Sequence, residues 1–414
     1  MKSILFLSCL LFLFVEPPLS AAAERFRTDI NPALLYWQAF GEWPSLSEED
    51  SAYVRTNDWR SRQPDERFGQ LMAQYDNSFK LLRRAAKAKV PCDWGYDLTD
   101  GPEALLPGLA KAKAAAQTAR LRVHWHFQRG DQAAARDDLA AAFVLGRNVS
   151  KDRILISALV QFAIENIITA AVAENFYRFT PETLRQLLAE IDASPTRGTI
   201  AQCIAFERYS FRDWLVRNVR EIQKSSPSEE KAMTQIRELI RRFLSAGENP
   251  DFTQIEKVVK AAGSTPEGVI AYVKGVDALY DEADVLMTRP YPEFQTRIKA
   301  FNERVANHPN LFVHMFFPIF ENCRNKEFAA EVSIAMLRAG TEYRLAGEAG
   351  LKRVGDPVLK EPFAFRRFQF AGEDRGFELR SKFHGRGFEE ALIFVEKGGP
   401  SFQVSAKNVG KPVL

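Results

Sequence analysis

Residues 102–147 read PEALLPGLAKAKAAAQTARLRVHWHFQRGDQAAARDDLAAAFVLGR, and they indicate the fold class most directly. Ala, Leu, Lys, Arg and Gln dominate it, and these are strong helix formers. Arg129-Gly130-Asp131 interrupts the run, and Asp131 is a suitable N-cap for a second helix. Small and apolar residues recur on one face of that second helix: Ala135, Leu139, Ala142, Phe143 and Gly146. The stretch therefore predicts two antiparallel helices, over about 102–127 and 131–147, joined by a short turn.

The helical pattern continues toward the C-terminus. A third helix is expected over about 152–177, and a fourth begins at Thr180, whose hydroxyl can cap it, with Pro181 in the first position. A polar, proline-bearing stretch at 224–230 predicts a loop or a minor boundary. Further helices are expected over 198–223, 229–244, 252–262, 266–287, 291–306 and 310–348. Residues 24–348 are thus predicted to form antiparallel helical hairpins, either as a bundle or as an irregular solenoid.

A small β-unit is predicted to follow the last long helix, over 349–407. Short alternating or β-prone runs bounded by Gly and Pro predict an antiparallel sheet, and they lie at 363–370, 376–383, 391–395 and 401–404. The helix before them carries an apolar stripe at helical spacing: Phe328, Val332, Ala335, Met336, Ala339, Tyr343 and Ala346. We expect this stripe to pack into the helical body and tie the sheet to it, with Gly347 ending the helix. Residues 408–414 are expected to be a loose tail.

The N-terminus has the pattern of an export signal. Lys2 precedes the apolar run from Ile4 to Val15, and small residues follow at 20–23. A charged start, a short apolar core and a small-residue cleavage site are typical of a secretory signal peptide, here residues 1–23. The protein is therefore expected to be exported, either periplasmic or secreted. The alternative is a chain that stays anchored by an uncleaved N-terminal segment.

Composition and charge argue against two classes of binding partner, nucleic acid and the membrane interior. The chain has 414 residues, of which 46% are hydrophobic, and its 56 basic and 53 acidic residues give a net charge of +3. This balance provides no broad positive field for nucleic acid. The most apolar internal run, 154–173, is interrupted by Glu165 and Asn166. We therefore expect no nucleic-acid partner and no stable membrane span after signal cleavage.

Histidine and cysteine offer few candidates for chemistry. His124 and His126 diverge by about 200° on a helix and cannot easily hold one metal ion, so we expect two partly exposed residues near a helix end. Cys92 could pair with either histidine as a nucleophile, or its loop could simply pack on the bundle through Trp94. Cys203 has apolar neighbours at helical spacing and is expected to be buried. No catalytic, metal or cofactor-binding residue is assigned, and disulfide pairing among Cys92, Cys203 and Cys323 stays open.

Charged residues also interrupt apolar helices. Glu165 and Glu207 need ionic partners or solvent, because an unpaired buried acid costs several kcal/mol. Paired carboxylates on two helices could instead perform acid–base work. Arg338 and Glu342 are spaced as a simple i, i+4 pair. The phenylalanine-rich stretch 311–320 predicts a buried helix, or alternatively an apolar groove for a peptide or lipid.

Two segments resemble known groups of proteins. Exported helical proteins of planctomycete-like bacteria share the pattern of Asn31–Phe40, Cys92-Asp93-Trp94-Gly95, Leu105-Leu106-Pro107 and the two helices after it. The C-terminal part more distantly resembles type II secretion pseudopilins, through Ala329–Leu345, Asp356-Pro357, Phe365-Arg366 and Phe377–Ser381. Val358–Pro362 interrupts the pseudopilin pattern. The resemblance implies a helical fold and an exported location, and it implies no activity.

The sequence therefore predicts an exported, non-catalytic binding or scaffold protein of a bacterial cell envelope, with an envelope protein or peptide as its partner. The absence of sequence motifs for metalloprotease, serine hydrolase and nucleotide sites favours this class. The alternative is an exported hydrolase whose site is scattered over several helices, which motif searches do not detect. Whether the chain is an enzyme stays open at this point.

Overall fold

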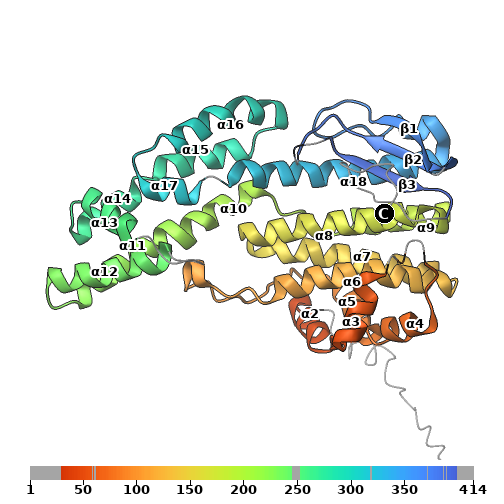
Figure 1. Cartoon of the computed structure of the whole chain (residues 1–414), viewed down its shortest axis with the longest axis horizontal. Coiled ribbons are helices and arrows are strands. Elements are labelled where there is room, and N and C mark those ends of the chain that lie inside the picture. Colours follow the sequence, from red (N-terminus) through yellow and green to blue (C-terminus); the bar gives the residue numbers. More distant parts are fainter. Residues whose placement is uncertain are drawn as a thin grey trace, which may run out of the picture.

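The computed structural model describes residues 29–57, 59, 62–244, 252–317, 319–370, 372–385, 387 and 389–398. Over these residues the protein is mainly helical, with one small antiparallel sheet near the end of the chain (Figure 1). This confirms the fold class predicted from the sequence. The predicted signal peptide at 1–23, the strand expected at 401–404 and the tail at 408–414 lie outside the described residues.

The elongated body has an N-terminal group of helices on one side and the sheet on the other (Figure 1). The N-terminal helices are α2 (Pro32–Gly41), α3 (Glu48–Thr56), α4 (Glu66–Ala73) and α5 (Asp76–Ala86). The middle of the body consists of α6 (Gly108–Gln128), α7 (Gln132–Val149), α8 (Leu155–Glu174) and α9 (Pro181–Asp192). Helices α6, α7 and α8 contact one another, and α5 packs on α7. Antiparallel hairpins with short connections therefore build the body, as predicted.

Local signals place the ends of these helices. Asp131 caps α7 by accepting a hydrogen bond from the Ala134 N–H at 2.9 Å, and the Thr180 hydroxyl accepts from the Thr183 N–H at 3.2 Å at the start of α9. The predicted inner face of α7 is buried. The predicted start of α6 near residue 102 is wrong, because only a 3-10 turn, η1 (Gly101–Glu103), forms there. Pro107 disfavours helical geometry at the residue before it, so α6 begins at Gly108.

Helix α8 runs through the middle of the body. By length and composition alone it could cross a membrane. In the structure it packs against α6, α7, α10, α18 and β3, and the Glu165 side chain in its centre is fully buried. These contacts are those of the core helix of a folded body.

A second group of helices extends from the body as an arm (Figure 1). It begins with α10 (Ile200–Glu207), a π-helical turn η4 (Arg208–Asp213) and α11 (Trp214–Ser225). It continues through α12 (Glu229–Leu244), α13 (Phe252–Ala261), α14 (Pro266–Lys274), α15 (Asp277–Met287), α16 (Tyr291–Ala306) and α17 (Leu311–Phe316). The single helix predicted over 266–287 is thus two helices, which a turn at Gly275-Val276 separates.

The long helix α18 (Phe320–Leu351) returns from the arm along the body. Its predicted stripe is buried from Phe328 to Ala339, whereas Ala346 at the far end is exposed. Ala346 and Gly347 leave helical geometry, and the φ of +62° at Gly347 favours glycine. The regular helix therefore ends where the sequence predicts, and one more turn follows to Leu351.

The sheet consists of β1 (Ala364–Phe370), β2 (Glu373–Arg380) and β3 (Ala391–Val395), in the order β1-β2-β3 with antiparallel pairing. Phe377 and Phe394 are fully buried on the face toward α18, and their rings stack with centroids 4.7 Å apart. A Cβ on Gly340 of α18 would lie 2.3 Å from the Phe394 ring. Only glycine allows so close an approach, which joins the sheet tightly to the helical body.

The two faces of β1 have different neighbours. Phe365 packs on Tyr343 of α18, whereas Phe368 packs with Ile393 and Val395 on the other face. On that second face Glu378 is fully buried and pairs with Arg366 and Arg380. Strand β1 therefore has phenylalanines on both of its faces.

Candidate functional site

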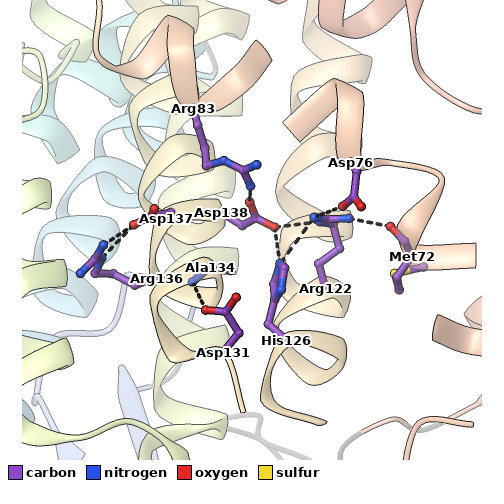
Figure 2. A network of polar contacts seen from close by, with 10 residues as sticks. All are labelled: Met72, Asp76, Arg83, Arg122, His126, Asp131, Ala134, Arg136, Asp137 and Asp138. Atoms are coloured by element: carbon purple, nitrogen blue, oxygen red, sulfur yellow. Dashed lines mark hydrogen bonds and ion pairs between the residues drawn. The ribbon is translucent and has the colours of Figure 1, made fainter. Parts of the chain in front are cut away.

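A network of buried charges joins three helices on the N-terminal side of the body (Figure 2). Asp138 of α7 is fully buried, and Arg122 of α6 is only 1% exposed. Arg122 Nε donates to Asp138 Oδ2 at 2.7 Å, and His126 Nε2 lies 2.8 Å from the same oxygen. Arg83 of α5 pairs with the other carboxylate oxygen. The Asp138 carboxylate thus holds α5, α6 and α7 together.

Arg122 makes further contacts on its other side. Its Nη2 donates to an oxygen of Asp76 at 2.9 Å, and its Nη1 donates to the backbone carbonyl of Met72 at 2.5 Å. The guanidinium also lies 4.5 Å from the centre of the Phe79 ring. All three nitrogens of this buried cation are therefore bound within the protein.

The charge on Asp138 is stabilised by its neighbours. Burial alone would raise the pKa of this carboxyl, but the hydrogen bond from His126 and the charges of Arg122 and Arg83 outweigh burial and lower the pKa below its ordinary value. Because an ionised carboxylate only accepts hydrogen bonds, Nε2 of His126 carries the proton that points at it. This arrangement fixes the imidazole within the network.

The expectation of partly exposed histidines is wrong. His124 and His126 are 4% and 5% exposed, because the N-terminal helices cover this end of α6. No group of three or more His, Cys, Asp or Glu suited to a metal ion occurs in the part of the chain that the structure describes. The sequence contained a signal for the network: Arg122 and His126 lie four residues apart on one helix, and Asp138 directly precedes Leu139 on the inner face of the next.

A groove lies beside this network. One hollow of about 520 Å³ is bordered by residues of α5, α6 and the start of α7, including Trp125 and His126. A second hollow of about 270 Å³ lies between α5, α7 and the end of α9. Arg83 and Asp137 border both hollows, which are therefore neighbours, and we call the two together the α5/α7 groove. Its size is within the range of ligand sites.

Basic residues of α5 line this groove. The segment Lys80–Lys89 contains five basic residues and no acidic one. Lys80, Arg83 and Lys87 of this segment border the groove. The sequence interpretation missed this segment, although the unbalanced charge is visible in the sequence itself.

The thiols are buried and reduced. Cys92, Cys203 and Cys323 are free cysteines with little exposure. Burial raises the pKa of Cys92 to about 12 and that of Cys323 to about 11, and it raises the pKa of Cys203 as well. A thiol needs a lowered pKa to act as a nucleophile near neutral pH. The loop at Cys92 instead packs on the body, where Trp94 Nε1 donates to the Asn148 carbonyl at 2.8 Å.

Glu165 forms inter-helix ion pairs. Its two oxygens lie 2.8 Å from Arg147 Nε and 3.0 Å from Arg197 Nη2. This confirms one of the alternatives predicted for this residue. The predicted pair of Arg338 with Glu342 is wrong, because Arg338 pairs with Asp192 of α9 and Glu342 lies nearer to Arg353. Arg338 thus joins two helices.

Glu207 is in a different situation. It is 8% exposed and lies at the end of α10, where it accepts a hydrogen bond from the Leu155 N–H at 3.3 Å. It forms no ion pair with any residue that the structure describes. Burial raises its pKa to about 7, and the Leu155 N–H offsets only part of this effect. Glu207 does not border the α5/α7 groove.

The phenylalanine-rich stretch belongs to the core. Phe312, Phe316, Phe317 and Phe320 are all less than 9% exposed. Rings of this stretch pack on Tyr280 and on Phe301. The phenylalanines of residues 311–320 are therefore buried as predicted, but the single helix predicted there is wrong, because the structure splits the stretch between α17 and the start of α18. Met315 and Ile319 of the same stretch are exposed.

Comparison with known proteins gives no further assignment: no family model matches the sequence, and no curated protein and no solved structure shows significant similarity to it. The resemblance to exported planctomycete-like proteins and to pseudopilins therefore stays a prediction. The functional argument depends on the geometry of this chain alone.

Proposed function

We propose that the protein is an exported, non-catalytic binding or scaffold protein of a bacterial cell envelope. The observation that carries the proposal is the α5/α7 groove. The buried charges beside it, Arg122, Asp138 and His126, neutralise one another within the protein, whereas Lys80 and Lys87 at its border are exposed. A rigid, internally paired floor with exposed side chains above it is suited to binding.

Support for the exported location comes from residues 2–23, whose pattern is that of a signal peptide. Support for a scaffold comes from the elongated helical body, whose long faces can contact another protein. Fold alone does not determine function.

Affinity capture tests this proposal. The mature protein, immobilised through a C-terminal tag, is incubated with an extract of the source envelope at low and at physiological salt. We expect one envelope protein or peptide to be retained in a near-stoichiometric amount. Retention of nothing above the level of an unrelated helical control would refute the binding function.

An exported hydrolase is the second candidate, and Glu207 is the observation that favours it. Burial raises the pKa of this carboxyl to about 7, a value that general acid–base catalysts share. A panel of ester, peptide and glycoside substrates tests this alternative, with Glu207→Gln as the matched variant. Hydrolysis by the wild-type protein that the variant lacks would replace the binding proposal with the enzyme.

A further inference from the structure

We propose that the α5/α7 groove binds an acidic segment of a partner polypeptide in an extended conformation. This inference depends on the proposed binding function and adds the chemistry of the ligand. Shape, charge and the composition of the two hollows each contribute to it.

The shape of the groove matches an extended chain. Lys80 of α5 and Lys87, the C-cap directly after α5, lie seven residues apart, which corresponds to about 10 Å along the helix axis. A strand-like peptide rises about 3.3 Å per residue, so three or four ligand residues span the distance between these lysines. Lys80 borders the hollow of about 520 Å³ and Lys87 the neighbouring hollow of about 270 Å³, so a chain of this length reaches both. Two neighbouring hollows suit a polypeptide better than a flat membrane surface.

The acidic residues of the groove are already engaged. Asp76 pairs with Arg122, and both Asp137 and Glu190 pair with Arg136. Asp131 caps α7. Asp76 thus has an arginine of its own, Asp137 and Glu190 share one, and Asp131 keeps its charge at the start of α7.

Basic residues of the groove remain available. Lys80, Lys87 and Arg129 border it and form no ion pair with any residue in the described ranges. Arg129 lies over the Trp125 ring at 4.8 Å, a contact that leaves its N–H groups free to donate. These three cations outnumber the two acidic charges that no arginine matches, Asp131 and one of the two carboxylates that share Arg136. The groove therefore has a small positive excess, which favours a ligand that carries carboxylates.

The second hollow offers apolar surface between its charged residues. Five of its ten border residues are small and apolar: Ala86, Ala140, Ala141, Val144 and Ala193. Small apolar side chains of a ligand can be buried against them. The expected ligand therefore alternates carboxylates with small apolar residues.

Fluorescence anisotropy with defined peptides tests the inference. The probe is a fluorescein-labelled dodecapeptide of alternating Glu and Ala, and its control is the same peptide with Gln in place of Glu. Measurements are made at about 50 mM salt, because exposed charges are strongly screened above physiological ionic strength. The groove variant is Lys80→Glu/Lys87→Glu. The matched control, Lys257→Glu/Lys260→Glu, makes the same charge change at exposed positions of α13.

We expect the groove variant to weaken binding of the acidic peptide at least tenfold and the control variant to weaken it less than twofold. Ala193→Trp, which fills the second hollow from an exposed position, should also weaken binding several-fold. The Gln peptide should bind at least tenfold more weakly than the Glu peptide. Circular dichroism and thermal melting verify that all variants are folded.

Several results would overturn the inference. One is an equal loss of peptide affinity in the groove and control variants, and another is no measurable binding of the acidic peptide. A third is complete displacement of the peptide by 5 mM inorganic phosphate, which would indicate a simple anion site. Preferential binding to anionic lipid vesicles in place of the peptide would also overturn it. If a captured envelope partner is retained equally by the groove variant, the groove assignment fails while the binding function stands. If the wild-type protein captures no partner, the proposed function itself fails.

Discussion

Replacing Glu207 with Gln should change how the stability of the protein depends on pH. Burial raises the pKa of Glu207 from 4.5 to about 7, and at 1.36 kcal/mol for each pH unit this corresponds to about 3 kcal/mol. The native state holds the proton more tightly than the unfolded chain. Between pH 4.5 and 7 the unfolded chain loses this proton while the native state keeps it, so stability falls as pH rises. Above pH 7 the full cost of about 3 kcal/mol is present.

Glu207→Gln removes this titration. The free energy of unfolding of the variant minus that of the wild type should therefore increase by about 3 kcal/mol between pH 4.5 and pH 8. The new amide group has its own cost if its N–H groups lack partners, but this cost is the same at every pH and cancels from the slope. Chemical denaturation followed by circular dichroism at pH 4.5, 5.5, 6.5 and 8 measures the difference.

Glu303→Gln is the matched control, because Glu303 is exposed on α16. Its difference from the wild type should stay constant within about 0.5 kcal/mol over the same range. A constant difference for Glu207→Gln as well would refute the argument, since it would mean that the Glu207 carboxyl is charged in the native state without a cost. Helix α10 would then have to be better solvated at its end than the structure indicates.

Four further outcomes are expected. Met336→Asp places a charge at a position that is 1% exposed, so it should destabilise the protein by several kcal/mol; an unchanged melting temperature would mean that the stripe on α18 is a surface. Gly340→Ala brings a Cβ to 2.3 Å from Phe394 and should cost about 1–3 kcal/mol, whereas Gly41→Ala, with no atom near its Cβ, should be neutral or stabilising in the same melting assay. Asp138→Ala leaves the buried Arg122 without its main partner and should cost about 3–5 kcal/mol in chemical denaturation, while Asp137→Ala next to it should cost less than about 1 kcal/mol; equal costs would contradict the network. N-terminal sequencing of the exported protein should find a start between Ala22 and Glu24, and an intact Met1 would refute the cleaved signal peptide.

The fold class could be predicted because its signals are local. Asp131 and Thr180 lie directly before the helices that they cap, and apolar periodicity identifies the inner face of α7 without knowledge of what covers it. The alternation of β2 and the glycine after the long helix are equally local. The wrong start predicted for α6 also has a local cause, which is Pro107. A helix start is harder to predict than the helix itself, because several neighbouring residues could each begin the first turn.

The candidate site depended on contacts between distant residues. His126 contacts Asp138 of the next helix, and Asp138 in turn pairs with Arg83 of a third helix. The pattern of a single helix cannot reveal this. Glu165 and Glu207 looked alike in sequence, since each interrupts an apolar helix. In the structure Glu165 forms ion pairs with two arginines, whereas Glu207 accepts a hydrogen bond from one backbone N–H. Sequence patterns identify such residues, and only their tertiary neighbours separate a structural ion pair from a titrating acid.

The position of α8 has a consequence for the synthesis and export of the protein. This helix resembles a membrane span in composition, and two of the elements that cover it, α18 and β3, are made after it. A nascent or truncated chain that stops before residue 320 would present a long apolar helix with part of its surface open to lipid or to other chains. Completion of the segment from residue 320 onward therefore decides whether α8 becomes a core helix or a site of aggregation and misinsertion. Quality control of this protein should depend more strongly on its C-terminal end than on its N-terminal helices.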